Sequence, residues 1–394
     1  MKKKNKTKGG NDYDNYDNYD NYENDNTYDN VYQEDISFKL LGSGTYGCVI
    51  KPAIFFDDNK NYIKNDYIAK VLYRKSSFDD EIKQLQMIQK IDPDNTFTVK
   101  IVNTEQTIKY KDIRNIPDLY DCIKDKLDTF LDKRRIEMDR DEKDNYVLYE
   151  IIQEYGGTPL AKINADNTKI TFKNAVVLLE TFLSGIEKMH NNGLIHLDIK
   201  PDNMVLSSTK LSLIDFGLSS SIENVFVNDK NYLLESAYLY YPDEFNIARH
   251  MMDNQKKTGL QFLKEMIKYI ETDQKFHQSL FIKHKENMLL VQKALLMFVE
   301  DIYKNAEKTN TLNDISFSSV FNESLALKSD VYSLASLIKI FNDIIDYNNS
   351  HQKNFIQILF DFCKQPNPYK RKDIFEIVKK FKKMKDAMIT NNYI

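Results

Sequence analysis

Two short apolar runs, each leading to an acidic residue, constrain this chain more than any other feature. The first, at residues 194–206, reads Leu-Ile-His-Leu-Asp-Ile-Lys-Pro-Asp-Asn-Met-Val-Leu, and the second, at residues 211–218, reads Leu-Ser-Leu-Ile-Asp-Phe-Gly-Leu. Asp198 stands five residues before Asn203 and seventeen before Asp215. The pattern predicts two short strands that bring two carboxylates, an amide and a lysine to one place.

This combination of side chains is typical of phosphoryl transfer from a nucleotide. The reaction needs a carboxylate that orients the attacking hydroxyl, a cation beside the transferred group and oxygen ligands for magnesium. Asp198 would accept the hydroxyl proton, and Lys200 would lie beside the γ-phosphate. Asn203 and Asp215 would hold the metal through oxygen. We therefore expect Asp198 and Lys200 to be catalytic and Asn203 and Asp215 to bind metal.

A glycine-rich run, Leu-Gly-Ser-Gly-Thr-Tyr-Gly-Cys-Val, occupies residues 41–49. Glycines at 42, 44 and 47 let backbone amides approach an anionic ligand, and Val49 offers an apolar face to a planar base. The same letters also fit a tight hairpin or a dinucleotide-binding turn. A dinucleotide turn opens a helix, whereas Val-Ile-Lys-Pro is β-branched and ends at proline, which indicates the return strand of a hairpin.

Lys70 lies within the apolar strand predicted at residues 67–73. It is either an exposed lysine at a sheet edge or a lysine directed at phosphate from a buried strand, and the order of the motifs favours the second reading. Residues 78–91 have helical spacing. Glu81, near the start of that helix, is either a solvated acid of the first turn or the ion-pair partner of Lys70.

In this order, the motifs resemble those of eukaryotic-type protein kinases, serine/threonine class. The resemblance implies a two-lobed α+β fold with a small β-rich N-lobe and a larger helical C-lobe. It implies ATP and Mg2+ as cofactors, with Mn2+ as a substitute, and a protein as substrate. Asp198 becomes the catalytic base, and Lys200 favours serine and threonine over tyrosine. The Tyr-Gly-Cys-Val-Ile-Lys-Pro signature and the Asn-, Lys-, Ile- and Tyr-rich composition are also similar to kinases of large DNA viruses.

The resemblance also implies which residues bind the nucleotide. Lys70, paired with Glu81, would anchor phosphate, and backbone groups of Glu154 and Gly156 would face the adenine edge. The full predicted set is Leu41, Gly42, Ser43, Gly44, Thr45, Tyr46, Gly47, Cys48, Val49, Lys70, Glu81, Glu154 and Gly156.

Three further matches are structural rather than catalytic. Glu244, at the end of the activation segment, would pair in the interior with Arg371. Asp330 looks like the start of the central helix of the large lobe. His196 would be a scaffold residue packed beneath the metal-binding loop.

The chain departs from the family pattern at three points. Leu197 stands where many kinases have the arginine that binds a phosphorylated activation loop, so activity should not depend on phosphate docking there. Ser236 and Ala237 stand where a threonine is common. Lys70 and Glu81 are eleven residues apart, which is short for such a pair, so either the helix is truncated or the pair forms differently.

The domain plan is a tail, two lobes and two insertions. Residues 35–156 would form the N-lobe with a helical insertion near 105–145, and residues 157–394 the C-lobe with a helical insertion near 252–322. Within the second insertion, helices are predicted at residues 260–270 and 280–302. That insertion either packs onto the large lobe or offers a partner-binding surface. Residues 1–34, lysine-rich and then an Asp-Asn-Tyr repeat, are predicted to be disordered.

Composition narrows the functional classes. The net charge of −4 argues against binding nucleic acid or anionic lipid, and the longest apolar runs are too short for a membrane helix. Three cysteines and no apolar leader favour a reducing, cytoplasmic location (host cytoplasm or virion if the chain is viral) and argue against a disulfide framework. Cys48 is predicted to be a small apolar filler rather than a reactive thiol, and Cys122 and Cys363 to be structural.

Three functions remain open from the sequence. The first is an ATP- and magnesium-dependent protein serine/threonine kinase, because every phosphate-handling residue type is present. The second is a nucleotide-binding pseudokinase or scaffold, which loss of Asp198 or Asp215 would have indicated. The third is a small-molecule kinase of the same fold, against which Lys200, the glycine run and the Glu244–Arg371 pair count.

Overall fold

The structure, a computed structural model, describes residues 37–44, 46–56, 61–104, 106–163, 165, 167–226 and 239–394. The predicted disordered tail lies outside these residues, as do Thr45, Ser236 and Ala237. No helix in the described ranges combines the length and the apolar character that crossing a membrane requires.

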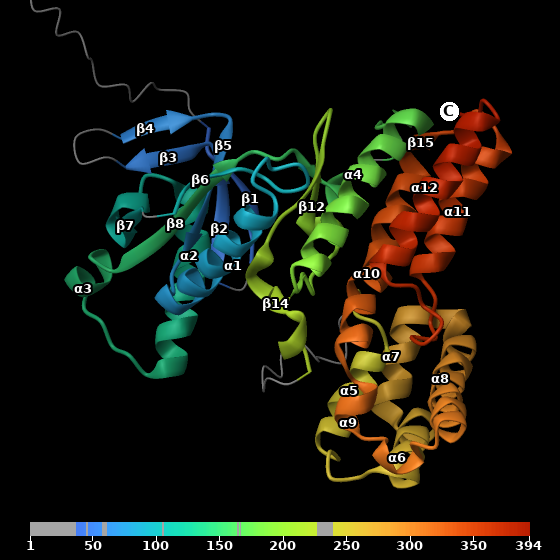
Figure 1. The fold of residues 1–394 in the computed structure, drawn as a ribbon. Helices are drawn as coiled ribbons and strands as arrows, with labels where there is room; N and C mark the ends of the chain where they lie inside the picture. Colours follow the sequence, from blue (N-terminus) through green and yellow to red (C-terminus); the bar gives the residue numbers. More distant parts are fainter. Residues whose placement is uncertain are drawn as a thin grey trace, which may run out of the picture. The chain divides into compact units, whose positions relative to one another are not determined.

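An antiparallel sheet forms the N-terminal part of the described chain (Figure 1). Its strands follow the order β1-β2-β5-β8-β6, and β7 also pairs with β8. The bounds are β1 Lys39–Ser43, β2 Gly47–Lys51, β5 Tyr67–Leu72, β6 Ile101–Asn103, β7 Thr107–Lys109 and β8 Val147–Glu154. Because β1 and β2 pair antiparallel on either side of the glycine run, the predicted hairpin is confirmed. A second hairpin, β3 (Ala53–Phe56) with β4 (Asn61–Lys64), separates β2 from β5 along the chain.

Helices cover both faces of this sheet, because successive side chains of a strand point to opposite faces. On β8, Ile151 lies in a core shared with α1 (Lys75–Ile91), whereas Ile152 lies in a core shared with α2 (Pro117–Arg134). Helix α2 belongs to the first insertion, and α3 (Arg140–Asp144) follows it. The buried residues of α2 recur at the predicted helical spacing: Leu119, Ile123, Leu127 and Leu131.

Four helices form the centre of the larger, helical part. They are α4 (Phe172–Asn191), α10 (Glu323–Ile344), α11 (Ser350–Cys363) and α12 (Ile374–Thr390). Figure 1 shows them side by side, and they share one apolar core with α1. The prediction that the central helix starts at Asp330 is wrong: α10 begins at Glu323, because the Asn322 side chain caps it by accepting from the Leu325 N–H.

Short strands carry the polar loops between these helices. Strand β12 pairs antiparallel with both β13 and β9, and β11 pairs with β14. A parallel pair, β10 with β15, joins the start of α4 to the end of α10. The bounds are β9 Thr158–Pro159, β10 Ile170–Thr171, β11 Leu194–Ile195, β12 Met204–Leu206, β13 Leu211–Leu213, β14 Ser220–Ser221 and β15 Ile345–Asp346.

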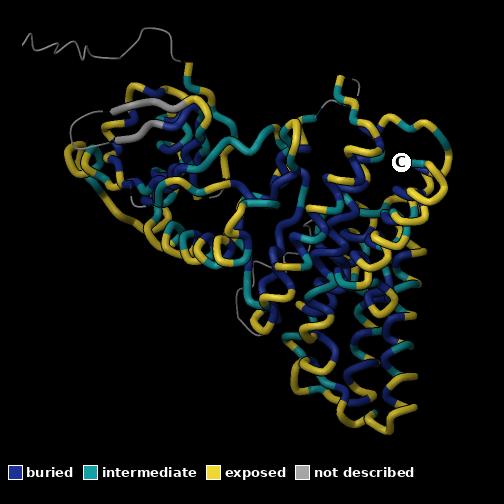
Figure 2. The backbone as a smooth tube through the Cα atoms, turned by 45° about the horizontal axis from the view of Figure 1, so that its top comes forward, coloured by how far each residue is buried: buried dark blue, intermediate teal, exposed yellow. Residues whose placement is uncertain are grey.

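The second insertion is helical, and it packs onto the large lobe. It comprises α6 (Gly259–Thr272), α7 (Gln274–His284) and α8 (Met288–Thr309), between α5 (Glu244–Met252) and α9 (Phe317–Val320). Its apolar residues share a core with Ile195 and Leu197 beside the catalytic loop. Figure 2 shows buried backbone through the middle of this region and exposed backbone along its outer edge.

The predicted single helix over residues 280–302 is wrong, because the chain turns between α7 and α8. Lys285 adopts a left-handed backbone, with φ of 46°, and its N–H donates back to the Phe281 carbonyl. A 3-10 turn, Lys285–Asn287, then redirects the chain. Apolar residues recur at helical spacing on both sides of this turn, so the periodicity alone did not indicate the break.

A buried ion pair links Glu244, at the start of α5, to the C-terminal region. Arg371 donates from Nη1 to Glu244 Oε1 over 2.5 Å and from Nη2 to Oε2 over 3.2 Å. Both side chains are fully buried. The predicted pair is therefore present, and the small sheet with a largely helical remainder confirms the predicted two-lobed α+β fold.

Candidate active site

The polar side chains of the predicted catalytic loop, residues 196–203, gather on Asp198, which is 5% exposed. Lys200 Nζ donates to Asp198 Oδ2 over 2.9 Å, and Asn203 Nδ2 donates to the same oxygen over 2.6 Å. The five-residue spacing brings them together because a 3-10 turn, Pro201–Asn203, folds the chain back. The structure thus places two of the predicted residues, Lys200 and Asn203, on the carboxylate of a third, Asp198.

Asp330 on α10 holds this loop from beneath, a role that the sequence analysis missed. Its Oδ2 accepts from the His196 N–H and its Oδ1 from the Leu197 N–H, both over 2.9 Å. His190 Nε2 lies 3.1 Å from Oδ2. Leu197 has a left-handed backbone, with φ of 61°, which a branched side chain rarely adopts without such support. The sequence did contain a signal for this role, because Asp330 is an acid within a largely apolar stretch. The structure shows its neighbours Ser329 and Val331 to be buried.

His196 is a scaffold residue, as its place in the sequence predicts. Burial lowers its pKa, which keeps the ring neutral. Nδ1 accepts from the Asp198 N–H over 3.1 Å, so the proton is on Nε2, which lies 3.3 Å from the Ile214 carbonyl. The ring meets Phe216 edge-on at 4.9 Å. His196 therefore connects the backbone of Asp198 to the strand end that carries Asp215.

Asp215 lies directly opposite Lys70 of the small lobe. Lys70 Nζ is 3.0 Å from Asp215 Oδ1 and 2.6 Å from Glu81 Oε1. The Lys70 ammonium holds the pKa of Asp215 below its ordinary value. Although burial disfavours the charged amine, Asp215 and Glu81 together raise the pKa of Lys70. The lysine is therefore a permanent cation between two carboxylates from different segments.

Glu81 is the partner of Lys70 rather than a solvated acid, because it is 6% exposed on the inner face of α1. Burial raises its pKa, and Lys70 opposes that rise. The short spacing has not truncated the helix, since α1 spans seventeen residues and begins three residues before the predicted start. Lys70 lies on β5, between β2 and β8, so it is not at a sheet edge.

The glycine run has open space at its first glycine, Gly42, and a close backbone contact at its last, Gly47. An added Cβ at Gly42 would meet nothing within 4 Å, which leaves the backbone accessible to a ligand. At Gly47 an added Cβ would lie 2.3 Å from the Val71 carbonyl oxygen, so this position admits only glycine. Gly44 donates its N–H to the Gly47 carbonyl over 3.0 Å, which holds the turn.

The prediction about cysteine pairing is wrong. Cys48 is bonded to Cys122 in a disulfide, with 6.4 Å between the two Cα atoms, and is not a free apolar filler. The reason is the packing of α2, which places its Cys122 face against β2. Cys363 is buried and unpaired, and burial raises the pKa of its thiol to about 12.

The segment after β8 offers a backbone donor. The N–H groups of Glu154 and Tyr155 donate to small-lobe carbonyls over 2.9 and 2.8 Å. Within the described ranges, no hydrogen bond joins the Gly156 N–H to another backbone carbonyl. Gly156 itself cannot carry a Cβ, which would lie 2.5 Å from a Val99 methyl and 2.7 Å from a Val205 methyl.

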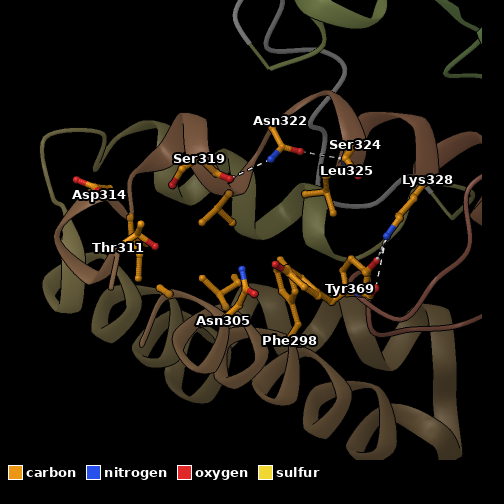
Figure 3. A pocket seen from close by; sticks show the side chains of 15 residues that line it. Phe298, Asn305, Thr311, Asp314, Ser319, Asn322, Ser324, Leu325, Lys328 and Tyr369 are labelled. Carbon is orange, nitrogen blue, oxygen red and sulfur yellow. Dashed lines mark hydrogen bonds between the residues drawn. The ribbon is translucent and has the colours of Figure 1, made fainter. Parts of the chain in front are cut away.

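A separate cavity of about 450 Å3 lies in the helical part, where α8, α9 and the start of α10 meet (Figure 3). None of the candidate site residues lines it. Its walls include Phe298, Leu325 and Tyr369, and Lys328 donates to the Pro368 carbonyl over 3.2 Å at one end. It is therefore distinct from the residues around Asp198.

The comparison with known families agrees with this geometry. The family model described as the protein kinase domain matches residues 36–240, more than half of the 394-residue chain. The matched range contains the glycine run, Lys70, Glu81, the catalytic loop and Asp215. Because model and chain agree over that range, and the fold has the two expected lobes, the chain belongs to the protein kinase family.

Proposed function

We propose that this kinase transfers the γ-phosphate of ATP to a serine or threonine hydroxyl of a protein substrate. The observation that carries the proposal is the cluster in which Lys200 and Asn203 both donate to Asp198. Lys70 forms an ion pair with Asp215, and these motifs follow one another along the chain in the order typical of the family. Each residue type that phosphoryl transfer needs is thus present and held by hydrogen bonds.

Asp198 acts as the catalytic base. Its Oδ2 is occupied by Lys200 and Asn203, so the carboxylate is fixed in orientation. The attacking hydroxyl gives its proton to this carboxylate as its oxygen bonds to phosphorus. Lys200, 2.9 Å from Asp198, places a positive charge where the transferred group gains negative charge.

Lys70 and the glycine run position the nucleotide. Lys70 stays charged between Glu81 and Asp215 and can exchange part of that contact for phosphate oxygens. Backbone amides of residues 41–49 approach the phosphates where Gly42 leaves space. The Gly156 N–H and the Glu154 carbonyl would bind the adenine edge.

The oxygen ligands that this site offers suit Mg2+, and Mn2+ could take its place. Asn203 directs its Nδ2 at Asp198, which leaves its Oδ1 as a metal ligand, and Asp215 contributes a carboxylate. Two protein oxygens leave most of an octahedral Mg2+ shell open, and phosphate oxygens would complete the set. When bound, the ion neutralises charge on the phosphates.

Serine/threonine specificity rests on Lys200, two residues after Asp198. Activity should not depend on docking of a phosphate at position 197, because Leu197 offers no cation for it. Leu197 is 2% exposed and packs in one apolar core with Val225, Phe226 and Tyr241.

The test is transfer of labelled γ-phosphate from ATP to a generic protein substrate with Mg2+. Asp198→Asn keeps the size and removes the base, and Asp202→Asn, an exposed acid of the same loop, is the matched control. We expect label on serine and threonine with the wild type and the control, and a loss of about 10^3-fold with Asp198→Asn. Nucleotide binding without transfer would instead make the chain a scaffold, and label confined to small molecules would make it a small-molecule kinase.

A further inference from the structure

The disulfide joins the first insertion to the strand that carries the nucleotide loop. Cys122 lies on α2, and Cys48 follows Gly47 on β2. In the sheet, Cys48 stands between Ser43 of β1 and Val71 of β5. The bond therefore ends one residue from the last glycine of the run, on a strand adjacent to that of Lys70.

The two sulfur-bearing residues differ in access. Cys48 is fully buried between the sheet and α2, whereas Cys122 is partly exposed. A thiolate in solution therefore approaches the bond from the side of Cys122 rather than from that of Cys48. Cys48 is the leaving group in such an attack, because the displaced sulfur is always the one that is not attacked.

We propose that Cys48 and Cys122 form a reversible modification site that takes low-molecular-weight thiols and disulfides as co-reactants and sets the affinity of the nucleotide loop for ATP. This inference rests on the proposed function. In the reducing direction, a thiolate attacks Cys122 Sγ, the Cys48–Cys122 bond breaks, and Cys48 leaves as a thiolate and takes a proton. A second thiolate attacks the small-molecule sulfur of the mixed disulfide, releasing Cys122 and a small-molecule disulfide. Two thiols are oxidised and one disulfide is reduced.

Packing keeps α2 in place in both states. Four buried residues of α2 contact the outer face of the sheet, where Ile50 and Val71 lie, so reduction does not release the helix. What changes is the restraint on β2: the oxidised chain fixes it covalently on the face opposite α1, and the reduced chain holds it by apolar contact alone. A nucleotide loop with fewer restraints is less preorganised for its ligand.

The expected result is therefore an effect on ATP affinity and not on the chemical step. Reduction should raise KM for ATP about three- to tenfold, with kcat changed less than about twofold. Both cysteines belong to the core between the sheet and α2, whereas Asp198, Lys200 and Asn203 are held by bonds to one another, so the loop at residues 198–203 should keep its geometry.

The experiment equilibrates the full chain in glutathione buffers of increasing oxidised fraction. Free thiols are alkylated and located by peptide mass, ATP affinity is measured by titration calorimetry, and KM is measured in the transfer assay. Cys122→Ser removes the pair and leaves Cys48 in its core position. Cys363→Ser, in the large lobe, is the matched control.

We expect the wild type and Cys363→Ser to gain ATP affinity as Cys48 and Cys122 become protected from alkylation. Cys122→Ser should hold the lower affinity at every buffer ratio. Alkylation of both cysteines under all conditions, or pairing that leaves ATP affinity unchanged, would overturn the proposal. If no phosphate is transferred in any state, the calorimetric and mass data still decide the redox proposal, while the proposed function alone fails. If Cys122→Ser does not fold, the wild-type titration still gives the answer.

Discussion

Replacement of Asp330 by asparagine tests whether this buried acid positions the catalytic loop. Asparagine has one acceptor oxygen, so either the His196 or the Leu197 N–H loses its acceptor and faces an amide NH2 group. A hydrogen bond to a charged acceptor contributes about 1.5–3 kcal/mol, and a buried donor left unpaired costs about 1–3 kcal/mol. We expect the free energy of unfolding to fall by about 3 kcal/mol.

The same substitution should also lower the rate of phosphate transfer. The strained backbone of Leu197 relaxes when its N–H is released, and Asp198 is the next residue. A displacement of about 1 Å at a reacting group costs about 10^2-fold in rate. We therefore expect kcat to fall about 10^2-fold while KM for ATP stays within about twofold, because Lys70 and Glu81 do not contact Asp330.

The assays are thermal unfolding and steady-state phosphate transfer. The entropy of unfolding is about 2.1 cal/mol/K per residue, so a loss of about 3 kcal/mol lowers Tm by about 4 °C in the unit Phe38–Ile394. Asp343→Asn, an exposed position on the same helix, is the control and should match the wild type in both. A variant at Asp330 with wild-type kcat would refute the positioning role, even if its Tm fell.

Three further predictions concern other buried charges. Burial raises the pKa of Glu150 to about 8, so the folded chain holds a proton there that the unfolded chain releases near pH 4.5. The free energy of unfolding should therefore fall as the pH rises from about 4.5 to 8. In Glu150→Gln, Tm should depend less on pH over that range. Glu81→Gln weakens the 2.6 Å contact with Lys70 and should lower kcat/KM for ATP about tenfold or more in the transfer assay, whereas an unchanged value would contradict a role for this pair. Arg371→Met leaves the Glu244 carboxylate buried and unpaired, which should lower the free energy of unfolding by about 3–5 kcal/mol in urea titration, and a smaller loss with the double variant Glu244→Gln/Arg371→Met would confirm the coupling.

The catalytic loop was predictable because its chemistry is local. Asp198, Lys200 and Asn203 lie within six residues, and a single turn brings them together, so their types and spacing alone indicated the cluster. The hairpin at the glycine run was equally predictable, because β-branched residues and a proline follow the glycines directly.

Features that depend on distant packing were not predictable in this way. Cys48 and Cys122 are 74 residues apart, and only the docking of α2 on the sheet makes them neighbours. The turn at Lys285 was hidden because apolar spacing continues through it. The start of α10 carried a local signal, the capping Asn322, which the motif at Asp330 obscured.

The cavity of Figure 3 is a space for a small molecule that lies apart from the predicted nucleotide site. Its wall includes Leu325 and Lys328 on the first turns of α10, the helix that reaches the catalytic loop through Asp330. A compound bound there would contact this helix away from the predicted nucleotide site, so any inhibition that it caused would not be relieved by excess ATP. Because part of the cavity comes from the inserted helix α8, such a compound would discriminate against kinases that lack the insertion.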